Sequence, residues 1–226
     1  MRFEHFSRAA AGALALGVLA VPAAAADFTF TSWAPVGTLK SVTISPAPPV
    51  GSRVLAGAIR LSGRQNFAPT GSVEFDAFCI ELEHVLRTPP GDYNIGTPSF
   101  SAAQQRDVRR LAGLYFADPT VFDADQRAAL QMAIWQVIYP TKTFTSTPAV
   151  DGHFSTFMAG LPTYQVDWGA RFIFAVSDAR GRKSQDLVIP GVVPEPATWA
   201  LLVSGFGLIG LGLRRRQRRA LAATAA

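Results

Sequence analysis

The sequence is poor in the residues on which many catalytic and metal sites are built. It has one cysteine, Cys79, and three histidines in 226 residues. An internal disulfide is therefore excluded, and a zinc site of cysteine and histidine ligands cannot be assembled. The chain also lacks a G-x-S-x-G nucleophile elbow, a Walker A loop, a dinucleotide-binding glycine pattern and an N-x-S/T acceptor. We expect no metal, no cofactor and no enzymatic activity.

Long apolar runs are missing from the middle of the chain and occur at its two ends. Residues 1–26 combine Arg2 and Arg8 with an apolar run from Ala9 to Val21 and end in three alanines. This pattern predicts a secretory signal that signal peptidase removes, with Asp27 starting the mature chain.

The carboxyl-terminal run, Ala197 to Leu213, has 17 residues without a charge. We predict that it forms a transmembrane helix at 197–213, with Trp199 at its outer interface. An arginine cluster follows directly and marks the cytoplasmic side, so the protein would be anchored in the inner membrane with its body outside. A short cytoplasmic tail, 220–226, would end the chain. The cluster comprises Arg214, Arg215, Arg216, Arg218 and Arg219.

The body of the protein also lacks a net positive charge. Residues 27–193 contain 14 Lys plus Arg and 14 Asp plus Glu, so the formal charge of +5 resides in the two ends. Targeting segments explain this basicity, and we expect no nucleic-acid partner. The neutral body, 27–191, is long enough for one exported domain with its own core.

The triplet Pro194-Glu195-Pro196 precedes the apolar run. With the glycine-rich helix and the arginine cluster, it makes residues 192–219 resemble the PEP-CTERM sorting signal. The resemblance implies that an exosortase-like membrane enzyme recognises the chain and cuts it near the triplet. The protein would then reach the cell surface or the extracellular matrix.

Hydrophobic periodicity predicts an α+β domain, an antiparallel sheet or sandwich with a two-helix insertion. A capping box at 101–104 starts the first helix, and Asp123 is the predicted N-cap of the second. A short third helix is expected at 155–161. The predicted strands lie at 28–33, 39–45, 54–61, 72–80, 171–177 and 184–190.

Two short motifs stand on different predicted elements: Phe78-Cys79-Ile80 on a strand and Leu130-Gln131-Met132-Ala133-Ile134-Trp135 on a helix. Together they resemble the thioester domains of bacterial surface adhesins. The resemblance implies that Cys79 is the thiol partner and Gln131 the acyl partner of an internal thioester, which an amine-bearing surface ligand could open. The third motif of those domains, aliphatic-Gln-Gly, has no clean counterpart, because Tyr164-Gln165-Val166 lacks the glycine.

A thioester is chemically reasonable at these residues. A thiolate is the nucleophile, and a carboxamide held in near-attack geometry can lose ammonia to it. The site would need shielding from water. The apolar side chains suited to this are Phe78, Ile80, Ile134 and Trp135.

Other readings of the same residues stay open. Cys79 is equally consistent with an inert buried thiol or with an intermolecular disulfide. Glu74, Asp76, Glu81 and Glu83 lack calcium-loop spacing, so a solvated strand face is expected. The predicted function is thus an exosortase-sorted surface or matrix protein, either a covalent adhesin or a structural, exopolysaccharide-associated biofilm component with an inert cysteine.

Overall fold

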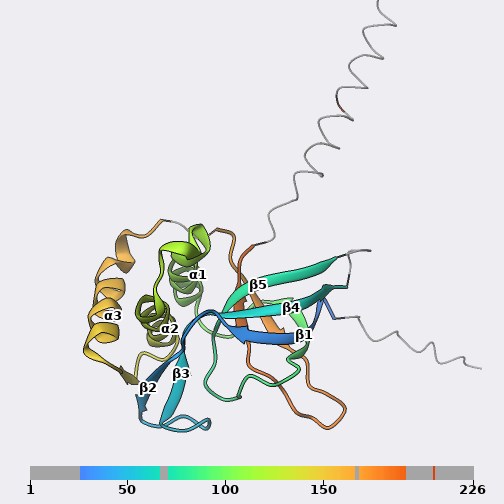
Figure 1. The fold of residues 1–226 in the computed structure, drawn as a ribbon, viewed down its shortest axis with the longest axis horizontal. Helices are drawn as coiled ribbons and strands as arrows, with labels where there is room; N and C mark the ends of the chain where they lie inside the picture. Colours follow the sequence, from blue (N-terminus) through green and yellow to red (C-terminus); the bar gives the residue numbers. More distant parts are fainter. Residues whose placement is uncertain (1–25, 67–70, 166–167, 192–205, 207–226) are drawn as a thin grey trace, which may run out of the picture.

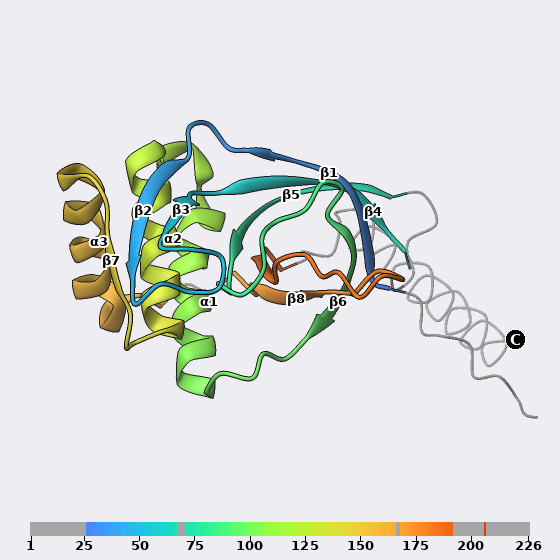
Figure 2. The same ribbon diagram turned by 90° about the horizontal axis from the view of Figure 1, so that it is seen from below.

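The computed structural model describes residues 26–66, 71–165, 168–191 and 206. These residues form a mixed α and β structure, as predicted. A closed six-stranded antiparallel barrel stands beside three α-helices, and a small three-stranded sheet lies against them. Figures 1 and 2 show the helices gathered at one side of the barrel, with β2 and β3 next to α2.

The sequence predicted an antiparallel sheet or sandwich, and the structure shows that the sheet closes into a barrel. Its strands follow the order β1-β4-β5-β9-β8-β6, and every neighbouring pair is antiparallel. Alternate residues point inward, which fills the interior with large apolar side chains such as Phe28, Leu61 and Tyr93. The strands are β1 Phe28–Pro35, β4 Ile59–Gln65, β5 Ser72–Cys79, β6 Gly91–Gly96, β8 Arg171–Ala175 and β9 Leu187–Ile189.

The small sheet has the order β3-β2-β7. Its strands are β2 Lys40–Ser45, β3 Arg53–Ala56 and β7 Thr143–Thr145. The predicted single strand at 54–61 is therefore wrong, since its two halves belong to different sheets. The break lies at Gly57, whose φ of +147° is a conformation that residues with a side chain rarely adopt. The chain leaves the small sheet at this glycine and enters the barrel at Ile59.

The helices begin where the capping residues predicted. Helix α1, Ala102–Ala117, has Ser101 as N-cap, and α2, Ala124–Ile138, has Asp123; both caps form complete capping boxes. Helix α3, Pro148–Gly160, begins well before the predicted short helix, because Thr147 caps it and Pro148 occupies its first turn. Two short 3₁₀ turns, η1 Pro119–Val121 and η2 Leu161–Thr163, complete the helical part of the described residues.

Helix α2 is the centre of the molecule. Every residue from 128 to 135 is buried, so the helix has no solvent-facing side along that stretch. It packs against α1 and α3 and against all three strands of the small sheet. The side chain of Gln131 is consequently enclosed by protein.

Strand β5 is buried on both faces near its end. Ala77 belongs to the barrel interior, while Phe78 packs outward against α1 and contacts Tyr115 edge to face at 5.1 Å. This arrangement explains why the alternation of polar and apolar residues stops at Phe78. Further back on the outer face, Asp76 accepts hydrogen bonds from Arg60 and from the Tyr115 hydroxyl.

The helices of the described ranges do not combine the length and apolar character that a membrane crossing needs. The predicted transmembrane segment 197–213 lies outside the described residues except for Phe206. The predicted signal, sorting triplet, arginine cluster and tail also lie outside them, apart from Ala26 at the end of the signal.

Gly63 tests the close contact between β1 and β4, and Gly152 serves as its control. A Cβ on Gly63 would lie 2.6 Å from the Cα of Phe30 and closer still to the carbonyl oxygen of Thr29, whereas Gly152, inside α3, has open space. We expect Gly63→Ala to lower the free energy of unfolding by about 1–3 kcal/mol, because backbone must move. Gly152→Ala should raise it by about 0.5–1 kcal/mol. Urea unfolding measures both, and equal effects of the two substitutions would contradict the described β1–β4 contact.

Candidate functional site

Cys79 is the last residue of β5 and lies where one neighbouring strand is missing. On one side, β5 pairs with β9 through Phe78 with Val188 and Cys79 with Leu187. On the other side, the β4 ladder ends at Ile59 opposite Ala77, since the chain turns away at Gly57. The backbone of Cys79 therefore has no strand partner in β4.

The side chain of Gln131 fills this gap. The backbone N–H of Cys79 donates to Gln131 Oε1 at 2.9 Å, and Gln131 Nε2 donates to the carbonyl oxygen of Cys79 at 2.7 Å. The carboxamide thus pairs with Cys79 as another strand would. Gln131 is only 1% exposed, so both of its polar atoms are satisfied inside the protein. The structure brings together the two residues that the sequence motifs singled out.

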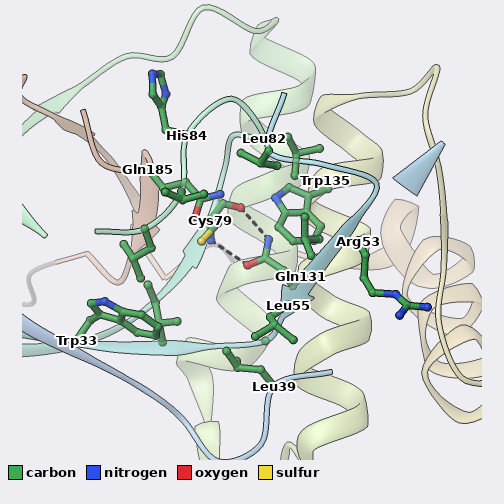
Figure 3. Close-up of a pocket in the computed structure, with 16 residues that line it drawn as sticks. Trp33, Leu39, Arg53, Leu55, Cys79, Leu82, His84, Gln131, Trp135 and Gln185 are labelled. Atoms are coloured by element: carbon green, nitrogen blue, oxygen red, sulfur yellow. Dashed lines mark hydrogen bonds between the residues drawn. The ribbon is translucent and has the colours of Figure 1, made fainter. Parts of the chain in front are cut away.

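A pocket of about 290 Å³ opens beside this pair, and Cys79, Gln131 and Trp135 all line it. Figure 3 shows Cys79 and Gln131 at its wall, joined by their two hydrogen bonds. Most of the remaining wall is apolar. Its apolar side chains include Leu39, Leu55, Ile59, Leu82, Val85 and Leu86.

The predicted shielding residues divide between two faces. Trp135 lines the pocket, and its ring also stacks on Phe144 in the adjoining core with centroids 6.1 Å apart. Phe78, Ile80 and Ile134 lie in the core cluster between the barrel and α1 and do not line this pocket. Strand alternation accounts for the first two, because the neighbours of Cys79 point to the opposite face of β5.

The surroundings of Cys79 disfavour its ionised form. Burial raises the pKa of the thiol from its ordinary value to about 12, and the nearby Glu81 carboxylate adds to the shift. The thiol is therefore protonated at neutral pH. A thiolate at this position is short-lived and strongly basic.

One further glutamine lines the pocket, and another that the sequence offered does not. Gln185, which the sequence motifs did not indicate, donates from Nε2 to the backbone oxygen of Glu81 at 2.8 Å and lines the pocket. Gln165, the residue nearest to a third thioester motif, is exposed beyond η2 and does not line the pocket. No local pattern around Gln185 could have predicted its place.

Glu81, Glu83 and His84 have ligand atoms within 4.8 Å of one another, the one such grouping found among the described residues. Glu81 already engages His84 Nδ1 at 2.8 Å and lies 3.7 Å from Lys183 Nζ. These two partners occupy the carboxylate that a metal would need. Of the other predicted acidic residues, Asp76 pairs with Arg60 and Glu74 lies 3.4 Å from the same guanidinium.

Comparison with known families addresses the carboxyl-terminal segment. A model described as the PEP-CTERM protein-sorting motif matches residues 192–216. The chain carries a PEP-CTERM sorting motif. The match includes Pro194, Glu195, Pro196 and Trp199 and the first arginines of the cluster, Arg214 to Arg216, while Arg218 and Arg219 lie just beyond it.

The PEP-CTERM motif confirms the predicted sorting signal and supports an exported protein that an exosortase-like enzyme processes. Searches of curated proteins and of solved structures found no match to the chain. The function of the body must therefore be argued from its own residues.

The pairing of Gln131 with Cys79 can be tested by substitution. Gln131→Leu leaves the N–H and C=O of Cys79 without partners, and we expect a loss of about 1–3 kcal/mol in the free energy of unfolding. Gln136→Leu, on the same helix, removes only a 3.5 Å contact to Pro140 and should change stability by less than about 0.5 kcal/mol. Urea unfolding of both variants gives the comparison. Similar losses would show that the Gln131 carboxamide has no special partner.

Proposed function

We propose that this protein is an exosortase-sorted surface protein that captures a ligand covalently through an internal thioester between Cys79 and Gln131. One observation carries the proposal: both polar atoms of the Gln131 carboxamide bind the backbone of Cys79. The carbon between those atoms is the electrophile, and the Cys79 sulfur is two bonds from the Cα of the same residue. The thiol and the carboxamide are therefore neighbours within one rigid frame.

The bond would form by simple acyl exchange. The Cys79 sulfur attacks the Gln131 amide carbon, the C–N bond breaks, and the thiol proton leaves with the nitrogen as ammonia. The Cys79 N–H, already bound to Oε1, would stabilise the negative charge that develops on that oxygen. A raised thiol pKa makes the attack slow. Slow attack suffices, since each molecule needs to form its thioester only once.

The pocket supports a role in capture. A thioester buried on all sides would be inaccessible to a partner, whereas Cys79 and Gln131 both border a pocket. A nucleophile on the ligand would enter there, attack the same carbon and displace the Cys79 thiol. The ligand would then be joined covalently to the former Gln131 side chain on the most enclosed helix of the domain.

The sorting segment supports a location outside the cell for this chemistry. In our proposal, signal peptidase removes residues 1–26, and the helix 197–213 holds the protein in the inner membrane with the arginine cluster inside. Cleavage near Pro194-Glu195-Pro196 then transfers the body, 27–191, to the cell surface or the matrix. A covalent bond suits that location, because a released ligand would be lost by diffusion.

A structural matrix role with an inert thiol is the second candidate. The raised pKa of Cys79 favours it, since a thiol protonated at neutral pH reacts slowly with anything. In that case the Gln131 hydrogen bonds would serve only to close the gap beside β5. The exported location would be the same, and the protein would associate with exopolysaccharide without a covalent bond.

Intact mass of the purified mature protein separates the two candidates. We expect a mass lower than that of the sequence by one ammonia, and slow addition of one methylamine on prolonged incubation with a large excess of that amine. Cys79→Ala should abolish both effects, while Gln136→Ala should leave both unchanged. A mass equal to the plain sequence, with Cys79 alkylated only after unfolding, would establish the inert thiol instead.

Processing can be tested at the triplet. Replacing Pro194, Glu195 and Pro196 together by alanine should leave a carboxyl-terminal tag attached to the protein in cells that contain the exosortase-like enzyme. Immunoblotting of the membrane fraction detects the retained tag. Pro190→Ala, just outside the matched segment, is the control and should be processed normally; loss of the tag from the triple variant would show that the triplet is not required.

A further inference from the structure

One residue of the pocket wall carries a buried hydrogen-bond donor that is not used within the described part of the protein. Trp135 is 2% exposed, and its indole Nε1 is buried without a hydrogen-bond partner among the described residues. It stands one helical turn after Gln131, so the two side chains share a face of α2. Figure 3 shows the indole nitrogen turned toward Cys79 and Gln131. A buried N–H without a partner is unfavourable, and a phenylalanine would avoid the cost.

The pocket wall includes a positively charged side chain and no negatively charged one among the described residues. No carboxylate is present among the described residues that line it, and its ionisable lining side chains other than Cys79 are Arg53 and His84. Arg53 is exposed at the edge of the small sheet and makes no ion pair with the described residues. Glu81 is close by, but it is engaged by His84 and Lys183 and faces a different cavity.

These features discriminate between nucleophiles. A lysine side chain or a simple alkylamine has a pKa of about 10.4 and is an ammonium ion at neutral pH. Moving an ammonium ion into an apolar pocket without a counter-ion is strongly unfavourable, and an arginine at the rim adds repulsion. A hydroxyl group carries no charge to desolvate, and its oxygen can accept a hydrogen bond from the Trp135 N–H.

We propose that the acceptor captured at this pocket is a saccharide hydroxyl, joined to Gln131 as an ester. This inference rests on the proposed thioester and names its substrate class. Two indole rings border the pocket and can pack against the apolar face of a sugar ring. That of Trp33 is held in place by a hydrogen bond from its Nε1 to the Thr88 hydroxyl at 2.9 Å.

The transfer step is balanced without any further reactant. The sugar oxygen bonds to the Gln131 acyl carbon, the carbon–sulfur bond breaks, and the hydroxyl proton passes to the Cys79 sulfur. The raised pKa of Cys79 means that the released sulfur holds this proton at neutral pH. The products are an ester at Gln131 and a free thiol at Cys79.

Competition between two acceptors tests the substrate class. Purified mature protein is incubated at neutral pH with methyl glucoside or with Nα-acetyl-lysine methylamide, and the adducts are followed by intact mass. We expect the glucoside adduct to form faster than the lysine adduct, and alkaline hydroxylamine to release it, since esters are cleaved under conditions that leave amides intact. A faster lysine adduct, or a gain of one water with neither adduct, would overturn the hydroxyl assignment.

Variants at the pocket mouth test whether charge causes the preference for a hydroxyl over an amine. Leu55 is 65% exposed and lines the pocket, while Val121 is 63% exposed on η1 and does not. Leu55→Asp supplies the missing counter-ion and should speed the lysine reaction about two- to fivefold, whereas Val121→Asp should not change it. An unchanged lysine rate in Leu55→Asp would show that charge does not set the selectivity.

The variant Trp135→Phe tests the role of the unpaired indole N–H of Trp135. The substitution removes the N–H but keeps an aromatic ring, and we expect the glucoside reaction to slow about tenfold. The loss of one ammonia from the intact mass should persist, which shows that the thioester still forms and that the protein has folded. A glucoside rate equal to that of the unsubstituted protein would refute the role of Trp135. Absence of the ammonia loss in the unsubstituted protein would refute the thioester, and with it this inference.

Discussion

The site depends on one interaction: the side chain of Gln131 pairs with the backbone of Cys79 where a neighbouring strand would otherwise do so. The β4 ladder ends at Ala77, two residues before Cys79, and the Gln131 carboxamide takes the place of the missing neighbour through two hydrogen bonds. The same departure of the chain at Gly57 opens the pocket on which Cys79 and Gln131 lie. The hydrogen bonding of Cys79 and the access to its sulfur therefore have a common origin.

The burial of α2 fixes the position of Gln131 relative to Cys79. Helix α2 is enclosed on every side between residues 128 and 135, and an enclosed helix has few alternative positions. Gln131 is thereby fixed against β5, which is itself held between β4 and β9. A reactive pair needs such support, because small displacements between the reacting atoms lower the rate sharply.

Local sequence signals correctly predicted the helix starts, which depend on interactions between residues close in sequence. Ser101 and Asp123 start their helices as expected, since a capping side chain and its partner lie three residues apart. The pairing of Cys79 with Gln131 followed from a resemblance, and the structure places the two residues in contact. The third helix was underestimated, although Thr147 and Pro148 formed an N-terminal signal.

Long-range features were not readable from the sequence. Residues 54–61 alternate as one strand, and only the tertiary structure assigns Arg53–Ala56 to one sheet and Ile59–Gln65 to another. Closure of the barrel depends on β6, Gly91–Gly96, which the predicted strands did not include, and on the pairing of β9 with both β5 and β8. Gln185 reaches the pocket from a segment 54 residues beyond Gln131, and its neighbours in sequence give no hint of this.

Strand β9 borders Cys79 and is also the last strand before the sorting segment. It has three residues, and it is bonded to β5 on one side and to β8 on the other. Mechanical tension that enters the domain from its carboxyl side therefore reaches β9 first. From β9 the load passes to two neighbours at once, the Cys79 strand β5 and the strand β8.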